Sequence, residues 1–371
     1  MAELLKDQYN LEFVQLLCKH LIKISSKAKK LSLNKDLVTL FMQQDWQDLE
    51  LKQRMNRAAL ISLTLIEQNN FKQACLLINK LSDQFDVFLG MFIPPMITDL
   101  FFSLEDKSQK PALPTAFESL KHVTKNSTSE FAVRAFIEQY EKQTMAFMLT
   151  CCSDKSEHVR RFASEGSRPR LPWGQALTTF KKDPSLIWPI LNELKQDSSL
   201  YVRRSVANNL NDISKDNPQL MLDWCEHNNK ISEKEDWIIK HACRVLLKQA
   251  HPRALKLFDY SDPSDITVDR FEINQTELKI GEKLSFSCLL SSKKKLGKIR
   301  VEYCIDYIKA NGKHNQKVFN WSEKTINKKT LKLTSTQSMA QMSTRKHYTG
   351  LHFISVRVNG LMFQKCQFEL K

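Results

Sequence analysis

The sequence predicts a mainly α protein, in which a solenoid of HEAT-like helical repeats is followed by a small all-β sandwich of the immunoglobulin type. Apolar residues recur at steps of three and four in the first part of the chain and alternate with polar residues in the last part. All eleven prolines lie at or before Pro263, whereas five of the eight glycines follow it. A motif that recurs after about forty residues indicates the helical repeats.

Four segments of the first part show the helical period. They are LEFVQLLCKHLIKI (11–24), RAALISLTLIEQ (57–68), FKQACLLINKL (71–81) and TMAFMLTCC (144–152). One face of each segment is apolar, which predicts amphipathic helices that bury this face against their neighbours.

The last part shows the period of β-strands. The segments LSFSCLL (284–290) and VEYCIDY (301–307) alternate apolar and polar residues. Asn-Gly pairs at 311–312 and 359–360 lie between such segments, and this dipeptide is a strong signal of a tight hairpin. Several strands in about a hundred residues predict a small antiparallel sandwich.

We expect the two domains to meet near residue 261, with a helical domain over residues 1–260 and a sandwich domain over residues 261–371. From residue 265 onward the chain has twenty lysines and arginines against nine acidic residues. The clusters 293–295 and 328–329 fall at expected loop tips. Each cluster alone fits a solvated, solubilising surface, and together they fit a contact with a polyphosphate.

The composition favours a basic intracellular protein. The net charge is +15, and a strongly basic protein commonly binds nucleic acid. No apolar run is long enough to span a bilayer, so no membrane association is expected. Nine cysteines, without a Cys-x-x-Cys pair, are typical neither of a disulfide framework nor of a zinc site. We expect a monomer in the reducing cytoplasm.

A repeated motif dominates the middle of the chain. DKSEHVRRFASEGSR begins at Asp154, DSSLYVRRSVANNLND begins at Asp197, and a looser copy, WIIKHACRVLLK, begins at Trp237. Val159 and Val202 are expected to face the neighbouring repeat. An adjacent stripe holds the residues that follow the arginine pair at helical spacing, namely Arg161, Glu165, Arg168, Arg204, Asn208 and Asp212. Stacked repeats would align these positions into a wall of arginines that fits a duplex backbone.

A structural interpretation of the same residues competes with this one. In HEAT repeats, aspartates and arginines often bond between neighbouring repeats, and this interpretation is favoured for Asp154, Arg160, Asp197 and Arg203. Arg161 and Glu165 also form an ordinary i,i+4 pair, worth about a few tenths of a kcal/mol on a surface. Periodicity and charge alone therefore predict a basic HEAT-like protein, and they do not reveal whether it is an enzyme.

Several segments resemble a known family. STSEFAVR (127–134), HVRRFASEGSRPRLPW (158–173), SLYVRRSVANNLNDISKDNP (199–218) and WIIKHACRVLLKQAHPRAL (237–255) closely resemble the AlkC-type DNA alkylation-repair glycosylases. LELKQRM and FLGMFIPPM near the start of the chain are also similar to that family. The likeness covers about residues 1–258 in order. The YIKANGK and KVF segments and the VRVNG turn resemble an immunoglobulin-like extension that some members carry.

The resemblance implies a monofunctional DNA glycosylase that acts on double-stranded DNA with alkylated bases. The implied substrates are 3-methyladenine, 3-methylcytosine and 1-methyladenine, released without flipping the base into a deep pocket. Glu130, Glu165 and Trp173 match active-site positions of the family, and Asp212 matches a further acidic position. Without the resemblance, Trp173 would be expected in the core or between helices.

The chemistry needs these residue types. A base alkylated on a ring nitrogen is already cationic and leaves as a neutral molecule, so positive charge develops on the sugar. A carboxylate beside the sugar stabilises that charge and can hold the attacking water. An indole face favours a cation. The arginines around Glu165 would be held by phosphates, which leaves the carboxylate to face the lesion.

The expected DNA-binding residues are basic or amide side chains of the repeats. They are Arg134, His158, Arg160, Arg161, Arg168, Arg170, Arg203, Arg204, Asn208, Lys240, His241 and Arg244. For His158 and His241 a structural role is an equal alternative. No nucleotide-binding or metal-binding motif is present, so neither a metal nor another cofactor is expected. Two other hypotheses stay open, a non-catalytic HEAT-repeat nucleic-acid-binding scaffold and a protein-binding solenoid.

Overall fold

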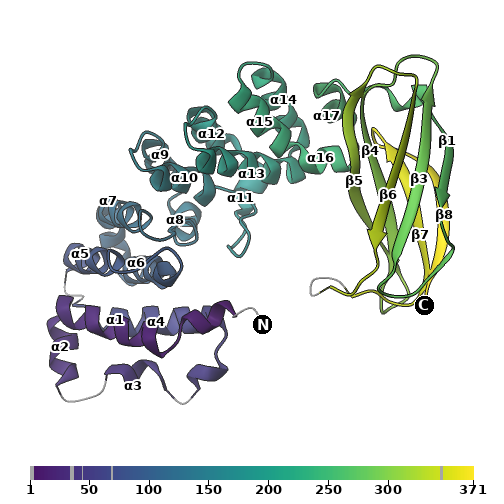
Figure 1. The fold of residues 1–371 in the computed structure, drawn as a ribbon. Coiled ribbons are helices and arrows are strands. Elements are labelled where there is room, and N and C mark those ends of the chain that lie inside the picture. The colour runs from purple at the N-terminus through teal and green to yellow at the C-terminus, as the bar shows by residue number, and fades with distance from the viewer. Residues whose placement is uncertain (1–3, 34–36, 44, 68–69, 343–345) are drawn as a thin grey trace. The chain divides into compact units, whose positions relative to one another are not determined.

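The computed structural model describes residues 4–33, 37–43, 45–67, 70–342 and 346–371 (Figure 1). The chain divides into two compact units. The first comprises residues 1–217 and 230–242, and the second comprises residues 218–229 and 243–371. The predicted class, mainly α with helical repeats followed by an immunoglobulin-like sandwich, is confirmed.

The first unit is built of helices, most of them short. They are α1 (Leu11–Ile24), α2 (Ser26–Ser32), α3 (Leu37–Phe41), α4 (Leu51–Leu65), α5 (Phe71–Ser82), α6 (Ile93–Phe102), α7 (Asp106–Val123), α8 (Val133–Gln139), α9 (Glu141–Cys151), α10 (Glu157–Gly166), α11 (Thr178–Lys182), α12 (Trp188–Leu194), α13 (Leu200–Asp216) and α15 (Glu233–Ala242). Single 3₁₀ turns lie at Leu5–Gln8, Trp46–Asp48, Leu89–Phe92 and Ser185–Ile187.

The four segments with helical period contain helices. The helix expected over 57–68 begins earlier, at Leu51, because Glu50 and Gln53 form a capping box there. The end of this expected helix, Gln68, lies outside the described residues. Each of the four segments buries apolar residues at helical spacing, such as Leu17 on α1, Ile78 on α5 and Met148 on α9.

The repeats pack as the motif predicts. Helices α10, α13 and α15 carry the three copies, and α13 contacts both of the others (Figure 1). Val159 and Val202 are fully buried. Arg160 Nε and Nη2 donate to the carboxylate of Asp197, at 2.6 and 3.0 Å, which joins one repeat to the next. Arg203 instead donates to the carbonyls of Asp197 and Ser198.

The second unit holds three short helices and the sandwich. The helices are α14 (Pro218–Asn228), α16 (Arg244–Lys248) and α17 (Pro252–Leu257), followed by a 3₁₀ turn at Pro263–Asp265. The strands are β1 (Ile266–Ile273), β2 (Glu277–Leu278), β3 (Lys283–Ser292), β4 (Gly297–Ile308), β5 (His314–Ile326), β6 (Thr330–Ser338), β7 (Gly350–Val358) and β8 (Leu361–Leu370). One sheet has the order β1-β3-β6 and the other β2-β8-β7-β4-β5.

The sandwich confirms the strand pattern, with one difference. The apolar positions of LSFSCLL and VEYCIDY form the core between the sheets. Glu302 holds a polar position of this alternation, on the opposite face of β4, and is nevertheless buried. Its carboxylate accepts hydrogen bonds from Arg357, at 2.5 and 2.8 Å, and from Arg300, which satisfies the buried charge. Asn359 and Gly360 both have positive φ and close the β7–β8 hairpin.

Two composition arguments also have structural counterparts. All nine cysteines are free thiols, and most are buried. Within the described ranges, none of the helices is long and apolar enough to cross a bilayer.

Candidate active site

The end of helix α10 approaches the segment before α8 closely, and a glycine permits this. A Cβ at Gly166 would lie 2.8 Å from both Met148 Cε and Val133 Cγ1, so a larger residue would push these elements apart. The Glu130 Cα lies 3.8 Å from the same point. Glu165, the residue before the glycine, is thereby brought near Glu130.

The carboxylate of Glu165 is buried, and both of its oxygens accept hydrogen bonds. Arg168 Nη1 donates to its Oε1 at 2.6 Å, and Ser205 Oγ donates to its Oε2 at 2.5 Å. The residue is 5% exposed. Arg168 Nε also donates to Asp212 Oδ2 at 2.8 Å, and Lys215 Nζ donates to Asp212 Oδ1 at 3.0 Å. One guanidinium therefore holds two of the predicted catalytic carboxylates in place.

Glu130 forms the second half of the site. Arg161 Nη1 donates to Glu130 Oε1 at 3.0 Å, and Arg161 Nη2 lies 3.7 Å from Glu165 Oε1, so this arginine bridges the two glutamates. Glu130 Oε2 is buried and accepts no hydrogen bond from any residue that the structure describes. Burial raises the pKa of the Glu130 carboxyl, and the positive charge of Arg161 opposes that shift.

Trp173 lies in a constrained loop after α10. Its φ of 68° is in the left-handed region, which costs a residue other than glycine about 1–3 kcal/mol. The loop is held by Lys52 Nζ, which donates to the Trp173 carbonyl at 3.2 Å, and by Arg134 Nε, which donates to the Gln175 carbonyl at 2.6 Å. The side chain is 63% exposed, which differs from the core position expected without the family resemblance.

A mainly apolar cavity of about 510 Å³ adjoins Trp173. Trp173 lines this cavity together with Met55, Met91, Pro95 and Phe131. Met55 belongs to the LELKQRM segment, and Met91 and Pro95 belong to the FLGMFIPPM segment. Four stretches that resemble the family, LELKQRM, FLGMFIPPM, STSEFAVR and HVRRFASEGSRPRLPW, thus each contribute residues to one cavity.

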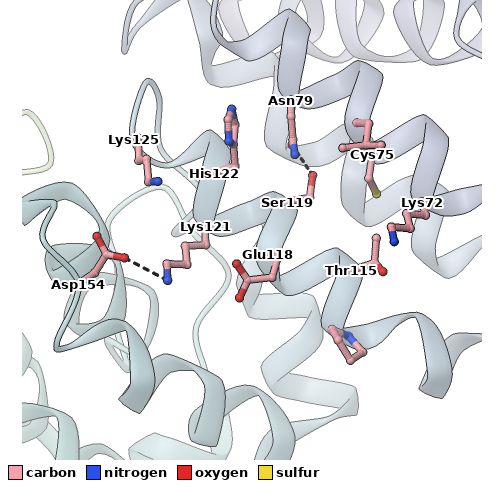
Figure 2. Close-up of a pocket in the computed structure, with 12 residues that line it drawn as sticks. Lys72, Cys75, Asn79, Thr115, Glu118, Ser119, Lys121, His122, Lys125 and Asp154 are labelled. Carbon is pink, nitrogen blue, oxygen red and sulfur yellow. Dashed lines mark hydrogen bonds and ion pairs between the residues drawn. The ribbon is translucent and has the colours of Figure 1, made fainter.

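A second cavity, of about 520 Å³, lies between α5 and α7 and is lined by lysines (Figure 2). Lys121 is paired with Asp154 at 3.0 Å, and His122 lies 2.8 Å from Asp83. Ser119 Oγ donates to Asn79 Oδ1 at 2.6 Å. Carboxylates thus balance part of the positive charge in this cavity, so it lacks the character of a dedicated anion site.

Several predicted DNA-binding arginines have protein partners in the structure. Arg134 is buried, donates to the carbonyls of Gly166 and Arg168, and burial lowers its pKa to about 10. Arg170 bonds both oxygens of Asp216 at 2.6 and 2.7 Å. Arg160, Arg161, Arg168 and Arg203 bond as described above. Buried guanidiniums require such partners, and DNA contacts by these residues stay a prediction.

The remaining predicted DNA-binding residues are more accessible. Arg204 and Lys240 are exposed on α13 and α15. His241 Nε2 lies 3.3 Å from Asn208 Oδ1, and the His158 ring packs edge-on against Tyr201. Arg244 is partly buried in the second unit. Within the described part of the chain, no group of three or more His, Cys, Asp or Glu side chains is placed to hold a metal ion.

The sequence argument missed two residues of this site. Ser205 bonds Glu165, and Tyr201 covers Arg161, whose Cζ lies 4.7 Å from the centre of the tyrosine ring. Ser205 occupies the position of Phe162 in the preceding repeat. A hydroxyl at a position where the repeat has a core residue is the signal that could have identified it.

Known proteins resemble this chain over its whole length. The chain is 39% identical to Uncharacterized protein YhaZ of Bacillus subtilis (strain 168), over 100% of both. It is 32% identical to Pseudomonas fluorescens alkylpurine DNA glycosylase AlkC, whose structure was solved bound to DNA containing an abasic site analog. That structure covers 100% of both chains with a TM-score of 0.88. This chain belongs to the AlkC family.

The likeness to AlkC includes the sandwich. Residues 267–371 match the family described as "Uncharacterised protein YhaZ, C-terminal Ig-like domain". The resemblance to AlkC-type proteins that the sequence showed over residues 1–258, and less strongly beyond, is therefore confirmed for the whole chain.

Proposed function

We propose that this protein is a monofunctional DNA glycosylase that hydrolyses the N-glycosidic bond of cationic alkylated bases. The proposed substrates are 3-methyladenine, 3-methylcytosine and 1-methyladenine in double-stranded DNA, released without deep base flipping. The observation that carries the proposal is the pair of buried glutamates, Glu130 and Glu165, bridged by Arg161. It occurs in a chain that matches an alkylpurine DNA glycosylase over its full length.

The two glutamates have different roles in this proposal. The unbonded Oε2 of Glu130 is the acceptor for the attacking water, because it accepts no hydrogen bond from the described residues, whereas both oxygens of Glu165 do. Glu165 is held by Arg168 and Ser205 and supplies negative charge to the oxocarbenium-like sugar. Trp173 presses its exposed indole face on the deoxyribose.

The arginines around Glu165, which the sequence predicts to bind DNA phosphates, bond carboxylates in the structure. Arg161 and Arg168 bond the carboxylates, so they position these groups. Phosphate contacts then fall to cations that are exposed, such as Arg204 and Lys240.

The proposal is tested by incubating the full chain with methylated duplex DNA and measuring free alkylated bases by chromatography. Release of 3-methyladenine without strand cleavage is expected. If the protein binds the duplex and releases no base, the scaffold hypothesis is correct. Duplex binding that does not weaken with salt would favour the protein-binding solenoid, because phosphate contacts give a steep negative salt dependence.

The rate of excision is expected to fall on the acid side at a higher pH than an ordinary glutamate would give. The pKa of Glu130 is raised by burial, so acidification protonates this carboxylate early and removes the acceptor for water. The measurement is the single-turnover rate against pH. In Glu130→Gln the residual rate should lose this acid limb, and an unchanged limb would assign it to another group.

We further propose that the helical part, residues 1–260, contains the glycosylase site and that residues 261–371 form a domain that grips the duplex. The family description covers 267–371 as an Ig-like domain. A monomer in a reducing cytoplasm fits the free cysteines.

Replacing Lys293, Lys294 and Lys295 by glutamine is expected to weaken binding to undamaged duplex. Each lost phosphate contact makes the slope of log K against log salt less negative by about 0.9. Fluorescence anisotropy at several salt concentrations measures this slope. A slope equal to that of the unchanged protein would make the cluster a solubilising surface.

A further inference from the structure

An aromatic and a cationic position recur together in the three repeats. The residue before the buried Val159, Val202 or Ile238 is His158, Tyr201 or Trp237. Three positions after each of these aromatic residues lies a cation, namely Arg161, Arg204 and Lys240. Positions i and i+3 lie on one helix face. We call these six residues the aromatic–cation ladder.

The helices that carry the ladder are packed in sequence order, α13 contacting both α10 and α15 (Figure 1). The rings of His158 and Tyr201 are 5.7 Å apart between centroids, so neighbouring steps of the ladder touch. Tyr201 also covers the guanidinium of Arg161, which bonds Glu130. The ladder is therefore continuous with the candidate active site.

The aromatic side chains are not core residues. Tyr201 is 38% exposed and Trp237 is 37% exposed. Trp237 stacks on His241 with an interplanar angle of 5° and a centroid distance of 5.2 Å, so one face of the indole lies against this histidine. A series of aromatic rings, each with a cation one helical turn away, is chemically complementary to a nucleic-acid strand. Bases stack on the rings and phosphates meet the cations.

We propose that the aromatic–cation ladder binds an unpaired strand of DNA that leads to the candidate active site. A base that remains paired and stacked in a duplex cannot present its face to Tyr201 or Trp237, whereas an unpaired base can. Arg204 and Lys240 take the phosphates between these bases. The proposal rests on the proposed function for its partner, DNA, and adds unpaired DNA to the substrate class.

The test measures binding of the full chain to undamaged DNA, so it needs no excision. The probes are a labelled thymidylate single strand of about twelve nucleotides and a duplex of the same length. Tyr201→Ala and Trp237→Ala are each expected to weaken single-strand binding about tenfold. Tyr201→Phe should bind normally, because it keeps the ring. Leu60→Ala, at a 63% exposed leucine of α4, is the matched control and should have no effect.

Salt dependence separates the rings from the cations. Tyr201→Ala should leave the slope of log K against log salt unchanged, whereas Arg204→Gln should reduce it by about 0.7 for a single strand. Equal single-strand affinity in the protein and both alanine variants overturns the ladder. Equal losses for the duplex and the single strand overturn the role of unpaired bases. Neither outcome affects the excision test of the proposed function.

Discussion

Glu165→Gln is expected to abolish the release of alkylated bases and to leave duplex affinity nearly intact. The substitution removes one negative charge beside the sugar, and loss of such a preorganised electrostatic group costs about 10²- to 10³-fold in rate. The amide keeps one oxygen that can accept from Ser205 or from Arg168, and Arg168 keeps its bond to Asp212, so the folded structure is expected to persist. Single-turnover release from methylated duplex and anisotropy on an uncleaved duplex measure the two quantities.

The control for this variant lies on the same helix. Glu157 begins α10, is exposed, and bonds the Ser199 hydroxyl. Glu157→Gln changes the net charge by the same amount but lies at the other end of the helix, so excision should continue at the ordinary rate. If Glu165→Gln instead lowers the melting temperature strongly or destroys duplex binding, the carboxylate is structural. If it excises normally, Glu165 has no catalytic part.

The helices and strands were predictable because their patterns are local. A helix that buries one face must repeat its apolar residues at helical spacing, and α1 and α5 begin at the residues that this period indicates. The hairpin at Asn359-Gly360 was predictable because both residues adopt positive φ there. The repeat in turn placed Val159 and Val202 correctly in the core.

The partners of the charged residues were not predictable in the same way. Arg168 is close in sequence to Glu165, but its second partner, Asp212, lies on another repeat, and only packing decides which lone pairs a guanidinium reaches. A count of charges cannot identify Ser205, because its side chain is neutral. Glu302 follows the polar phase of β4 and yet is buried, since two arginines meet it there. Side-chain pairing across repeats and strands is a tertiary property.

The sequence predicts which carboxylates share a candidate site, but it does not predict the partners that bond them. The resemblance placed Glu130 and Glu165, which are 35 positions apart in the chain, at one site, and the structure brings both within reach of Arg161. It also treated the neighbouring arginines as DNA ligands. Desolvation explains why these arginines bond carboxylates in the structure. A buried carboxylate without a counter-charge is costly, whereas an arginine on the surface is solvated by water.

Arg168→Met is expected to have the largest effect on stability. Arg168 is buried and donates to both Glu165 and Asp212, at 2.6 and 2.8 Å. Its removal leaves two buried carboxylates with less positive charge, and breaking such a pair costs about 3–5 kcal/mol. The melting temperature should fall by about 10 °C at neutral pH. Arg170→Gln, which breaks a half-exposed pair with Asp216, should cost less than about 1 kcal/mol.

Removing the partner charges distinguishes lost charge pairing from lost packing. Glu165→Gln together with Asp212→Asn removes the two buried charges that Arg168 compensates. In that background Arg168→Met should cost much less than in the unchanged protein, because residues of one charge network are energetically coupled. Thermal melts of both pairs of proteins measure the two costs. An equal cost in both backgrounds would mean that Arg168 stabilises the protein through its hydrocarbon stem, and that Glu165 and Asp212 are held by their other partners, Ser205 and Lys215.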